Sequence, residues 1–174
     1  MVRTGIGYDA HAFASGRALI LGGVDIPHEE GLDGHSDADV LAHAIIDALL
    51  GAAGVGDIGQ HFPDDDERYE GADSLELLRT VVSFLEQHHL AIRHVDATVV
   101  IERPKLAPYR DAIRESLAGA MRIGLGHVNV KATTGEGMGF IGRGEGAAAL
   151  AVATLERVDA EDDGPERLEP PARA

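Results

Sequence analysis

The spacing of apolar and polar positions predicts an extended conformation for the first part of the chain, residues 3–27. Residues 3–13 and 18–27 are rich in alternating apolar positions and are bounded by small and turn-forming residues. They predict two short strands joined by a turn at residues 14–17. Gly22 and Gly23 mark a second turn, so this region is expected to contribute short strands to a sheet.

The apolar period changes from that of a strand to that of a helix after Asp37. Ser36 or Asp37 is suited to be the N-cap of this helix, and Gly51 or Gly54 is suited to end it. The apolar face of the predicted helix consists of Val40, Leu41, Ala44, Ile45, Ala48 and Leu49.

Later segments alternate between the two periods. Helical spacing returns at residues 73–89 and 109–123, whereas residues 92–102 and 127–133 are β-branched and read as strands. Residues 147–158 are ambiguous, because their alanine content favours a helix while their position suits a closing strand. The order of elements predicts an α/β protein, an α+β sandwich whose mixed β-sheet has helices on one face.

Composition narrows the function classes. The 174 residues include 15 Lys and Arg against 30 Asp and Glu, a formal charge of -15, which argues against binding to nucleic acid or to anionic membranes. No apolar run approaches the roughly 20 residues that span a bilayer, and no secretory signal opens the chain, so a cytoplasmic location is expected. The chain has no cysteine, so any metal site must use histidine and carboxylate ligands.

The last residues differ in composition from the rest. Residues 158–174 contain six acids, two arginines and three prolines and show no apolar periodicity. Such a segment cannot bury enough surface to offset its ordering entropy, so we expect a disordered tail. Residues 1–157 are then expected to form a single domain.

Three residues form a candidate metal site. Asp9 and His11 lie two positions apart on a predicted strand and therefore point to the same side. His43, on the predicted helix, could supply a third ligand, and one carboxylate with two imidazoles leaves a zinc ion an open position. The alternative is an exposed turn aspartate and a hydrogen-bonded histidine without a metal.

Other polar segments surround this set. His35, Ser36 and Asp37 precede the helix, where amide groups could meet an anion, although Ser36 or Asp37 could equally be simple caps. The acids of residues 57–66 could hold a divalent cation, accept hydroxyl groups or be a solvated loop. Residues 133–146 contain six glycines, which permit a close approach of the backbone to a ligand.

Taken together, these stretches resemble the family of 2-C-methyl-D-erythritol 2,4-cyclodiphosphate synthases. The matching motifs appear in order over residues 3 to about 157. They are G-x-G-Y-D-A-H-x-F, L-G-G-V-x-I-P, H-S-D-A-D-V-x-x-H, D-A-L-L-G-A, G-D-I-G-x-x-F-P-D, G-A-D-S, R-P-K-L, N-V-K-A-T-T and G-R-G-E-G.

The resemblance implies a metal-dependent cyclisation of a cytidine diphosphate derivative. The substrate of the family is 4-diphosphocytidyl-2-C-methyl-D-erythritol 2-phosphate, which closes to a cyclic diphosphate and releases CMP in the non-mevalonate isoprenoid pathway. One zinc ion per subunit would be held by Asp9, His11 and His43, and a Mg²⁺ or Mn²⁺ ion by Glu136. The resemblance also implies a homotrimer around a sheet-lined central channel, with each active site between subunits and a strand at residues 147–158.

The resemblance further assigns substrate contacts. His35 and Thr134 match positions that stabilise the transition state, and Ser36 matches one that holds the 2-phosphate. The erythritol side would be lined by Asp57, Ile58, Gly59, Phe62, Pro63, Asp64, Asp65 and Asp66. The cytidine pocket would be formed by Ile101, Glu102, Arg103, Pro104, Lys105, Leu106, Ala107, Ala132 and Thr133, and Asp9, His11, Thr134, Gly135 and Glu136 would also contact substrate.

The resemblance leaves two points undecided, the occupant of the trimer channel and the effect of Gly135, and two other functions are considered beside it. Phe140 and Arg143 match positions near the trimer axis, where an isoprenoid diphosphate could occupy the channel, and Gly135 stands where relatives commonly have threonine. A divalent-metal phosphohydrolase is the alternative enzyme, because the same ligands could activate water. A non-catalytic trimer that binds a metal or an isoprenoid diphosphate is the third hypothesis.

Overall fold

The fold is built on a mixed sheet of five strands in the order β4-β1-β7-β5-β6, with a separate hairpin of β2 and β3. It comes from a computed structural model that describes residues 1–158, so the predicted tail lies almost wholly outside the described residues. β5 and β6 pair in parallel, and the other neighbouring strands pair antiparallel. The strands are β1 (Val2–Ser15), β2 (Leu19–Leu21), β3 (Val24–Ile26), β4 (Glu30–Leu32), β5 (Leu90–Val100), β6 (Val128–Thr133) and β7 (Gly146–Arg157).

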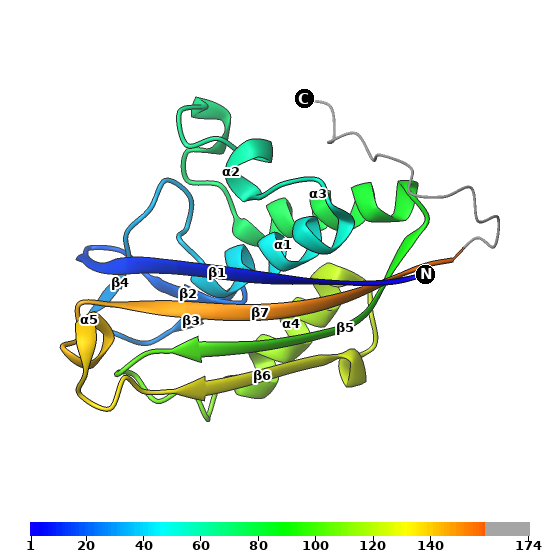
Figure 1. The fold of residues 1–174 in the computed structure, drawn as a ribbon. Coiled ribbons are helices and arrows are strands. Elements are labelled where there is room, and N and C mark those ends of the chain that lie inside the picture. Colours follow the sequence, from blue (N-terminus) through cyan, green and yellow to red (C-terminus); the bar gives the residue numbers. More distant parts are fainter. Residues whose placement is uncertain (159–174) are drawn as a thin grey trace.

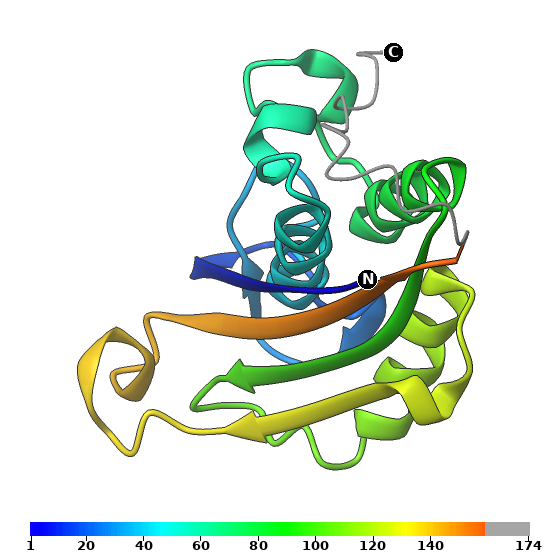
Figure 2. The same ribbon diagram turned by 45° about the vertical axis from the view of Figure 1, so that its right-hand side comes forward.

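Three long helices cover one face of this sheet (Figures 1 and 2), which confirms the predicted fold class. α1 packs on β1 and β7, while α3 and α4 pack over β5 and β6. The helices are α1 (Val40–Ala53), α2 (Ile58–His61), α3 (Ser74–Gln87), α4 (Arg110–Met121) and α5 (Gly139–Gly142), with single 3₁₀ turns η1 (Glu67–Tyr69) and η2 (Leu125–His127).

The alanine-rich last segment is a strand, β7, as the family resemblance implied. Its alternate residues Ala147, Ala149, Ala151 and Ala153 are fully buried under α1, and Leu150 and Val152 point to the opposite face. Alanine is used here because a helix lies directly over the strand and leaves room for only a methyl group. Tertiary packing therefore outweighs the helix propensity of the segment.

Two glycines on β1 bring α1 close to the sheet. A Cβ atom at Gly5 would lie 2.1 Å from the carbonyl oxygen of Ala48, and one at Gly7 would lie 1.9 Å from that of Ala44. No side chain fits in so small a space, so the helix backbone rests on the strand. The same approach carries His43, on α1, to the strand residues Asp9 and His11.

The prediction of the first helix cap was wrong. α1 begins at Val40, and its N-cap is Asp39, whose Oδ1 accepts the amide hydrogens of Leu41 (3.1 Å) and Ala42 (3.0 Å). Ser36 and Asp37 instead bond to residues outside that first turn. Because Asp39 takes these amides, the helix N-terminus does not offer them to an anion, whereas the predicted end at Gly54 is confirmed.

Several short helices and one short strand were not predicted from the sequence. The acidic loop contains α2 and η1, the glycine-rich segment contains α5, and β4 adds an edge strand. Each is three or four residues long, too short to show an apolar period. Among residues 1–158, no helix combines the length and the apolar character needed to cross a membrane.

Candidate functional site

A carboxylate and two imidazoles meet where β1 passes beneath α1. The Oδ2 atom of Asp9 lies 2.9 Å from His11 Nε2 and 3.0 Å from His43 Nδ1, and these two nitrogens are 3.3 Å apart. Each of the three side chains offers a ligand atom, and the three atoms lie within 4.8 Å of one another. Among the described residues this is the only group of three or more His, Cys, Asp or Glu side chains so arranged.

The electrostatics of the cluster suit a cation. Burial raises the pKa of the Asp9 carboxyl, but hydrogen bonds and charges from His11 and His43 outweigh it, and the pKa lies well below its usual range. For His11, burial acts to lower the pKa, yet the bonds and charge of Asp9 and the carbonyl of Asp33 raise it. The carboxylate thus stays ionised and attracts positive charge between the rings.

The backbone orients the first imidazole. His11 Nδ1 lies 2.6 Å from the carbonyl oxygen of Asp33, which can only accept a hydrogen bond. His11 Nδ1 therefore carries a proton, and Nε2, which faces Asp9 and His43, is the nitrogen that would bind a metal in the neutral ring. The arrangement presents a metal with an imidazole whose tautomer is already fixed.

Arg17 holds the loop that borders the cluster. Its Nη1 donates to the carbonyl of Gly34 (2.9 Å), and its Nη2 donates to the carbonyl of Ser36. The loop thereby places His35 and Ser36 at the rim of a cavity of about 210 Å³ that also contains the cluster. Predicted residues that line it are Asp9, His11, His35, Ser36, His43, Ile58, Gly59, Phe62 and Asp64.

Three further residues line this cavity and were not predicted from the sequence: Gly34, Tyr69 and Leu77. A Cβ atom at Gly34 would lie 3.1 Å from Cε1 of His11, so the glycine makes room for the imidazole ring. Tyr69 packs edge-on against Phe62 with ring centroids 5.3 Å apart. The aspartate-to-glycine step before His35 was a signal for a tight turn, whereas nothing in the local sequence marks Tyr69 or Leu77.

Part of the acidic loop has structural partners and does not line the cavity. Asp57 caps α2 through the amide of Gln60 (3.0 Å), and Asp66 binds the Arg68 guanidinium at 2.6 Å. Pro63 and Asp65 are likewise absent from the cavity lining given by residues 1–158. Asp47, one turn after His43 on α1, accepts the amide of Ile58 (2.8 Å) and so ties α2 to the cluster.

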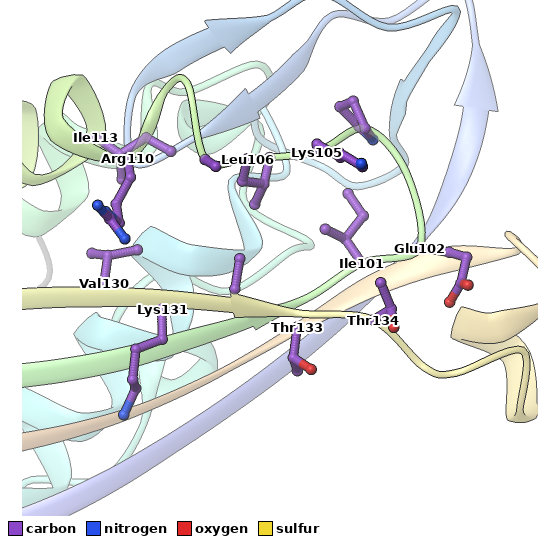
Figure 3. A pocket seen from close by; sticks show the side chains of 13 residues that line it. Ile101, Glu102, Lys105, Leu106, Arg110, Ile113, Val130, Lys131, Thr133 and Thr134 are labelled. Carbon is purple, nitrogen blue, oxygen red and sulfur yellow. The ribbon is translucent and has the colours of Figure 1, made fainter.

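A second pocket, of about 250 Å³, lies between β6 and the segment that joins β5 to α4 (Figure 3). It is lined by nine predicted residues: Ile101, Glu102, Pro104, Lys105, Leu106, Ala107, Ala132, Thr133 and Thr134. It is also lined by four that were not predicted: Arg110, Ile113, Val130 and Lys131. Arg103 is exposed and does not line it.

The glycine-rich segment follows this pocket directly. The Gly135 amide donates to Glu102 (3.0 Å), and the Thr134 hydroxyl donates to Glu136 (3.0 Å). A Cβ atom at Gly135 would lie 2.8 Å from the amide nitrogen of Gly142, so the loop as folded has no room for threonine there. Phe140 is 39% exposed, and Arg143 pairs with Glu145 at 2.7 Å, both outside the two pockets.

The two pockets share no lining residue within one subunit. The cavity at the cluster has carboxylate and imidazole groups, and the second pocket combines an apolar floor with hydroxyl and cationic groups. Together the fold and the cluster define an α/β protein with an Asp-His-His group that could hold a metal ion and a separate pocket on the same sheet.

The chain belongs to the YgbB family, whose model matches residues 2–156. It is 55% identical over 158 residues to the 2-C-methyl-D-erythritol 2,4-cyclodiphosphate synthase of Desulfitobacterium hafniense, covering 91% of this chain and all of the relative. It is 58% identical over 156 residues to the enzyme of that name from Geotalea daltonii, covering 90% of this chain and 91% of the relative.

Solved structures show the same fold. A 2C-methyl-D-erythritol-2,4-cyclodiphosphate synthase described as a CDP-bound form is 37% identical with a TM-score of 0.81, covering 88% of this chain and all of that one. The bifunctional IspDF from Campylobacter jejuni is 42% identical with a TM-score of 0.88 over 91% of this chain, which spans 43% of that longer chain.

Proposed function

We propose that this protein is a 2-C-methyl-D-erythritol 2,4-cyclodiphosphate synthase that acts in the cytoplasm as part of the non-mevalonate isoprenoid pathway. In the reaction, an oxygen of the substrate 2-phosphate bonds to the β-phosphorus, the bond from that phosphorus to the bridging oxygen breaks, and CMP leaves with the oxygen. The observation that carries the proposal is the Asp9, His11 and His43 cluster, in a chain 55% identical to enzymes of that name.

The donors of the cluster fit zinc. One ionised carboxylate and two imidazoles, one of them with its tautomer fixed by Asp33, match the three protein ligands of an open tetrahedral site. When bound there, zinc supplies Lewis-acid polarisation of a phosphate oxygen. No group need deprotonate the nucleophile, because a phosphate is already ionised at neutral pH.

The residues of the chain would orient the substrate and stabilise charge. His35 and Ser36, at the cavity rim, are suited to donate to the 2-phosphate, and Thr134 to the diphosphate. Glu136, beside Thr134, is our proposed ligand for a Mg²⁺ or Mn²⁺ ion on the diphosphate. Holding both reacting groups in line makes the attack intramolecular in an ordered geometry, which is the main demand of this chemistry.

The second pocket is our proposed cytidine site. Its apolar floor at Ile101, Leu106 and Val130 suits a base, and Lys105 adds a positive charge for a diphosphate. Two solved relatives described as CDP complexes or bound forms support a cytidine nucleotide as the ligand class. Asp64, which lines the cavity at the cluster, would accept hydroxyl groups of the erythritol.

We also propose a homotrimer. The sheet face opposite the helices exposes four large apolar side chains: Ile6 is 69%, Tyr8 55%, Leu150 40% and Val152 41% exposed. Ile6 is paired with Val152 and Tyr8 with Leu150 across β1 and β7, so the four form one patch. A continuous apolar patch on a sheet marks an interface, and packing three such faces together would bring the second pocket of one subunit to the cluster of its neighbour. Phe140 and Arg143 would then lie near the axis, where an isoprenoid diphosphate is a possible occupant.

Product analysis tests the reaction. The purified full-length protein with zinc and magnesium should convert the cytidylyl substrate to CMP and a cyclic diphosphate in equal amounts, followed by ³¹P NMR. Inorganic phosphate as the main product would indicate the phosphohydrolase instead. Binding of the substrate without any product would indicate a non-catalytic protein.

Protons and zinc compete for the side chains of the Asp9 cluster, so the pH dependence of zinc binding tests the proposed metal site. The depressed pKa of Asp9 adds stability above the unfolded-state pKa of about 3.9, and this stability is lost as the pH falls. The raised pKa of His11 adds stability below about pH 6.5, and this stability is lost as the pH rises through the folded-state value. Without metal, the cluster is therefore most stabilising between about pH 4 and pH 6.5.

The gain in melting temperature on adding zinc should accordingly grow from pH 5 to pH 8, as the proton that competes with zinc leaves the His11 imidazole. Differential scanning fluorimetry of chelator-treated and zinc-loaded protein measures this gain. The variant His11→Ala should show little gain at any pH. A gain that is equally large at pH 5 and pH 8 in the native protein would mean that the cation binds elsewhere.

A further inference from the structure

The second imidazole of the cluster is oriented by side chains and not by the backbone. His43 Nδ1 faces Asp9 and His11, and its other nitrogen, Nε2, lies 2.9 Å from the hydroxyl oxygen of Ser74. Ser74 is the first residue of α3 and is fully buried. Ser74 does not line the cavity at the cluster, and it bonds to the His43 nitrogen that is not directed at Asp9 and His11.

We propose that Ser74 and Asp37 form a hydrogen-bond relay that fixes His43 with its Nδ1 lone pair toward the metal, so that both are positioning residues for metal binding. This inference rests on the proposed function and deepens it. The number of hydrogens on each group decides the direction of each bond. The Ser74 hydroxyl has one hydrogen, and it is donated to Asp37 Oδ1.

The direction of the next bond follows from that count. With its hydrogen committed to Asp37, Ser74 Oγ presents only lone pairs to His43, so His43 Nε2 must be the donor and must carry the proton. In a neutral ring, the form that would bind a metal, the other nitrogen, Nδ1, then has a lone pair, whereas in the metal-free protein Nδ1 hydrogen-bonds to Asp9. This is the nitrogen that lies 3.0 Å from Asp9 Oδ2.

The far end of the relay is anchored at two points. Asp37 accepts the hydroxyl hydrogen of Ser74 through Oδ1 and the amide hydrogen of Ser74 through Oδ2 (3.1 Å). Ser74 is fully buried and Asp37 half-buried, so these bonds are partly shielded from water, which strengthens them. A carboxylate that holds a hydroxyl against an imidazole N–H fixes the orientation and tautomer of the ligating ring.

We assign Ser36 a different role from Ser74, although both hydroxyl groups lie near the His43 imidazole. Its hydroxyl oxygen is 3.2 Å from His43 Nε2 and accepts the amide hydrogen of Ala38 (3.1 Å). Unlike Ser74, it lines the cavity. We therefore assign Ser36 to the substrate and Ser74 to the metal ligand, and the two serines should give different results when each is changed to alanine.

The central measurement is zinc affinity, obtained by competition with a chelator at one pH. Ser74→Ala should weaken zinc binding about 10-fold to 100-fold, the usual cost of losing such a partner, and Asp37→Asn should weaken it less. Ser74→Thr, which keeps the hydroxyl, should restore the affinity. Ser36→Ala should leave zinc affinity near that of the native protein while it raises KM for the substrate.

A matched control uses the same substitution on the same helix. The Ser83 hydroxyl donates to the carbonyl of Arg79 (3.0 Å), so Ser83→Ala removes a hydroxyl from α3 without touching His43. It should leave zinc affinity unchanged. The melting temperature of each chelator-treated variant separates metal affinity from folding, since a purely structural Ser74 would lower that temperature and leave zinc affinity intact.

A spectroscopic measurement needs no variant to fold. In the zinc-loaded native protein, ¹⁵N NMR of the imidazoles should show His43 protonated at Nε2 with a slowly exchanging proton. Protonation at Nδ1, or zinc affinity in Ser74→Ala equal to that of Ser83→Ala, would overturn the relay. Absence of zinc binding in the native protein would overturn the proposed function instead, so the two failures are distinguishable.

Discussion

Replacing His43 with alanine should lower turnover at least about 1,000-fold and remove most of the bound zinc. The ring supplies one of only three ligand groups in the cluster, at 3.0 Å from Asp9. A Lewis acid at a phosphoryl group contributes several kcal/mol to the barrier, and each 1.36 kcal/mol corresponds to a factor of ten in rate. Metal analysis and CMP release on the same preparation measure the two effects together.

A control separates this loss from the loss of any histidine. His127, in η2, is exposed and bonds only to the carbonyl of Arg93 (2.8 Å) among the contacts described, so His127→Ala should keep both zinc and turnover. The side chain of His43 is half-buried, and its removal leaves a space that water can fill, so the variant is expected to fold. Full zinc content together with full turnover in His43→Ala would show that the Asp9 cluster is not the catalytic metal site.

The sequence predicted this cluster because two of its residues are close along the chain. Asp9 and His11 fall on one side of a strand by the alternation of side chains alone. His43 could be added only as a chemically suitable neighbour, because nothing in a linear pattern shows which helix crosses which strand. The contact depends on Gly5 and Gly7, which let α1 rest on β1.

The relay through Ser74 and Asp37 shows what a single sequence cannot supply. These residues lie 37 positions apart and meet because α3 begins beside the loop that precedes α1. Each was open to a simpler interpretation, Asp37 as a helix cap and Ser74 as an ordinary first-turn residue. The helix cap proved to be Asp39, which leaves Asp37 free to bind Ser74.

Placing a charge on the outer face of the sheet should dissociate the proposed trimer and stop turnover while the metal stays bound. Leu150 is 40% exposed in the single subunit and lies in register with Tyr8, at the centre of the apolar patch. An aspartate there would be buried without a partner in each of the three subunits. An uncompensated buried charge costs about 3–5 kcal/mol, so Leu150→Asp should run as a monomer in size-exclusion chromatography with light scattering.

Turnover of Leu150→Asp should fall about 100-fold or more, because the cluster and the proposed cytidine pocket belong to different cavities in one chain. Zinc affinity should persist, since all three ligand residues come from the same subunit. This pattern is the converse of that for His43→Ala, which loses the metal within an intact assembly.

Leu125→Asp is the matched control for this variant. Leu125 is also 40% exposed but lies in η2, away from the apolar patch, so the same substitution should leave both assembly and turnover unchanged. A monomeric Leu150→Asp with native turnover would mean that one subunit completes the site alone. In that case the second pocket would have to reach the Asp9 cluster by movement of the glycine-rich segment, and the role proposed for the neighbouring subunit would be wrong.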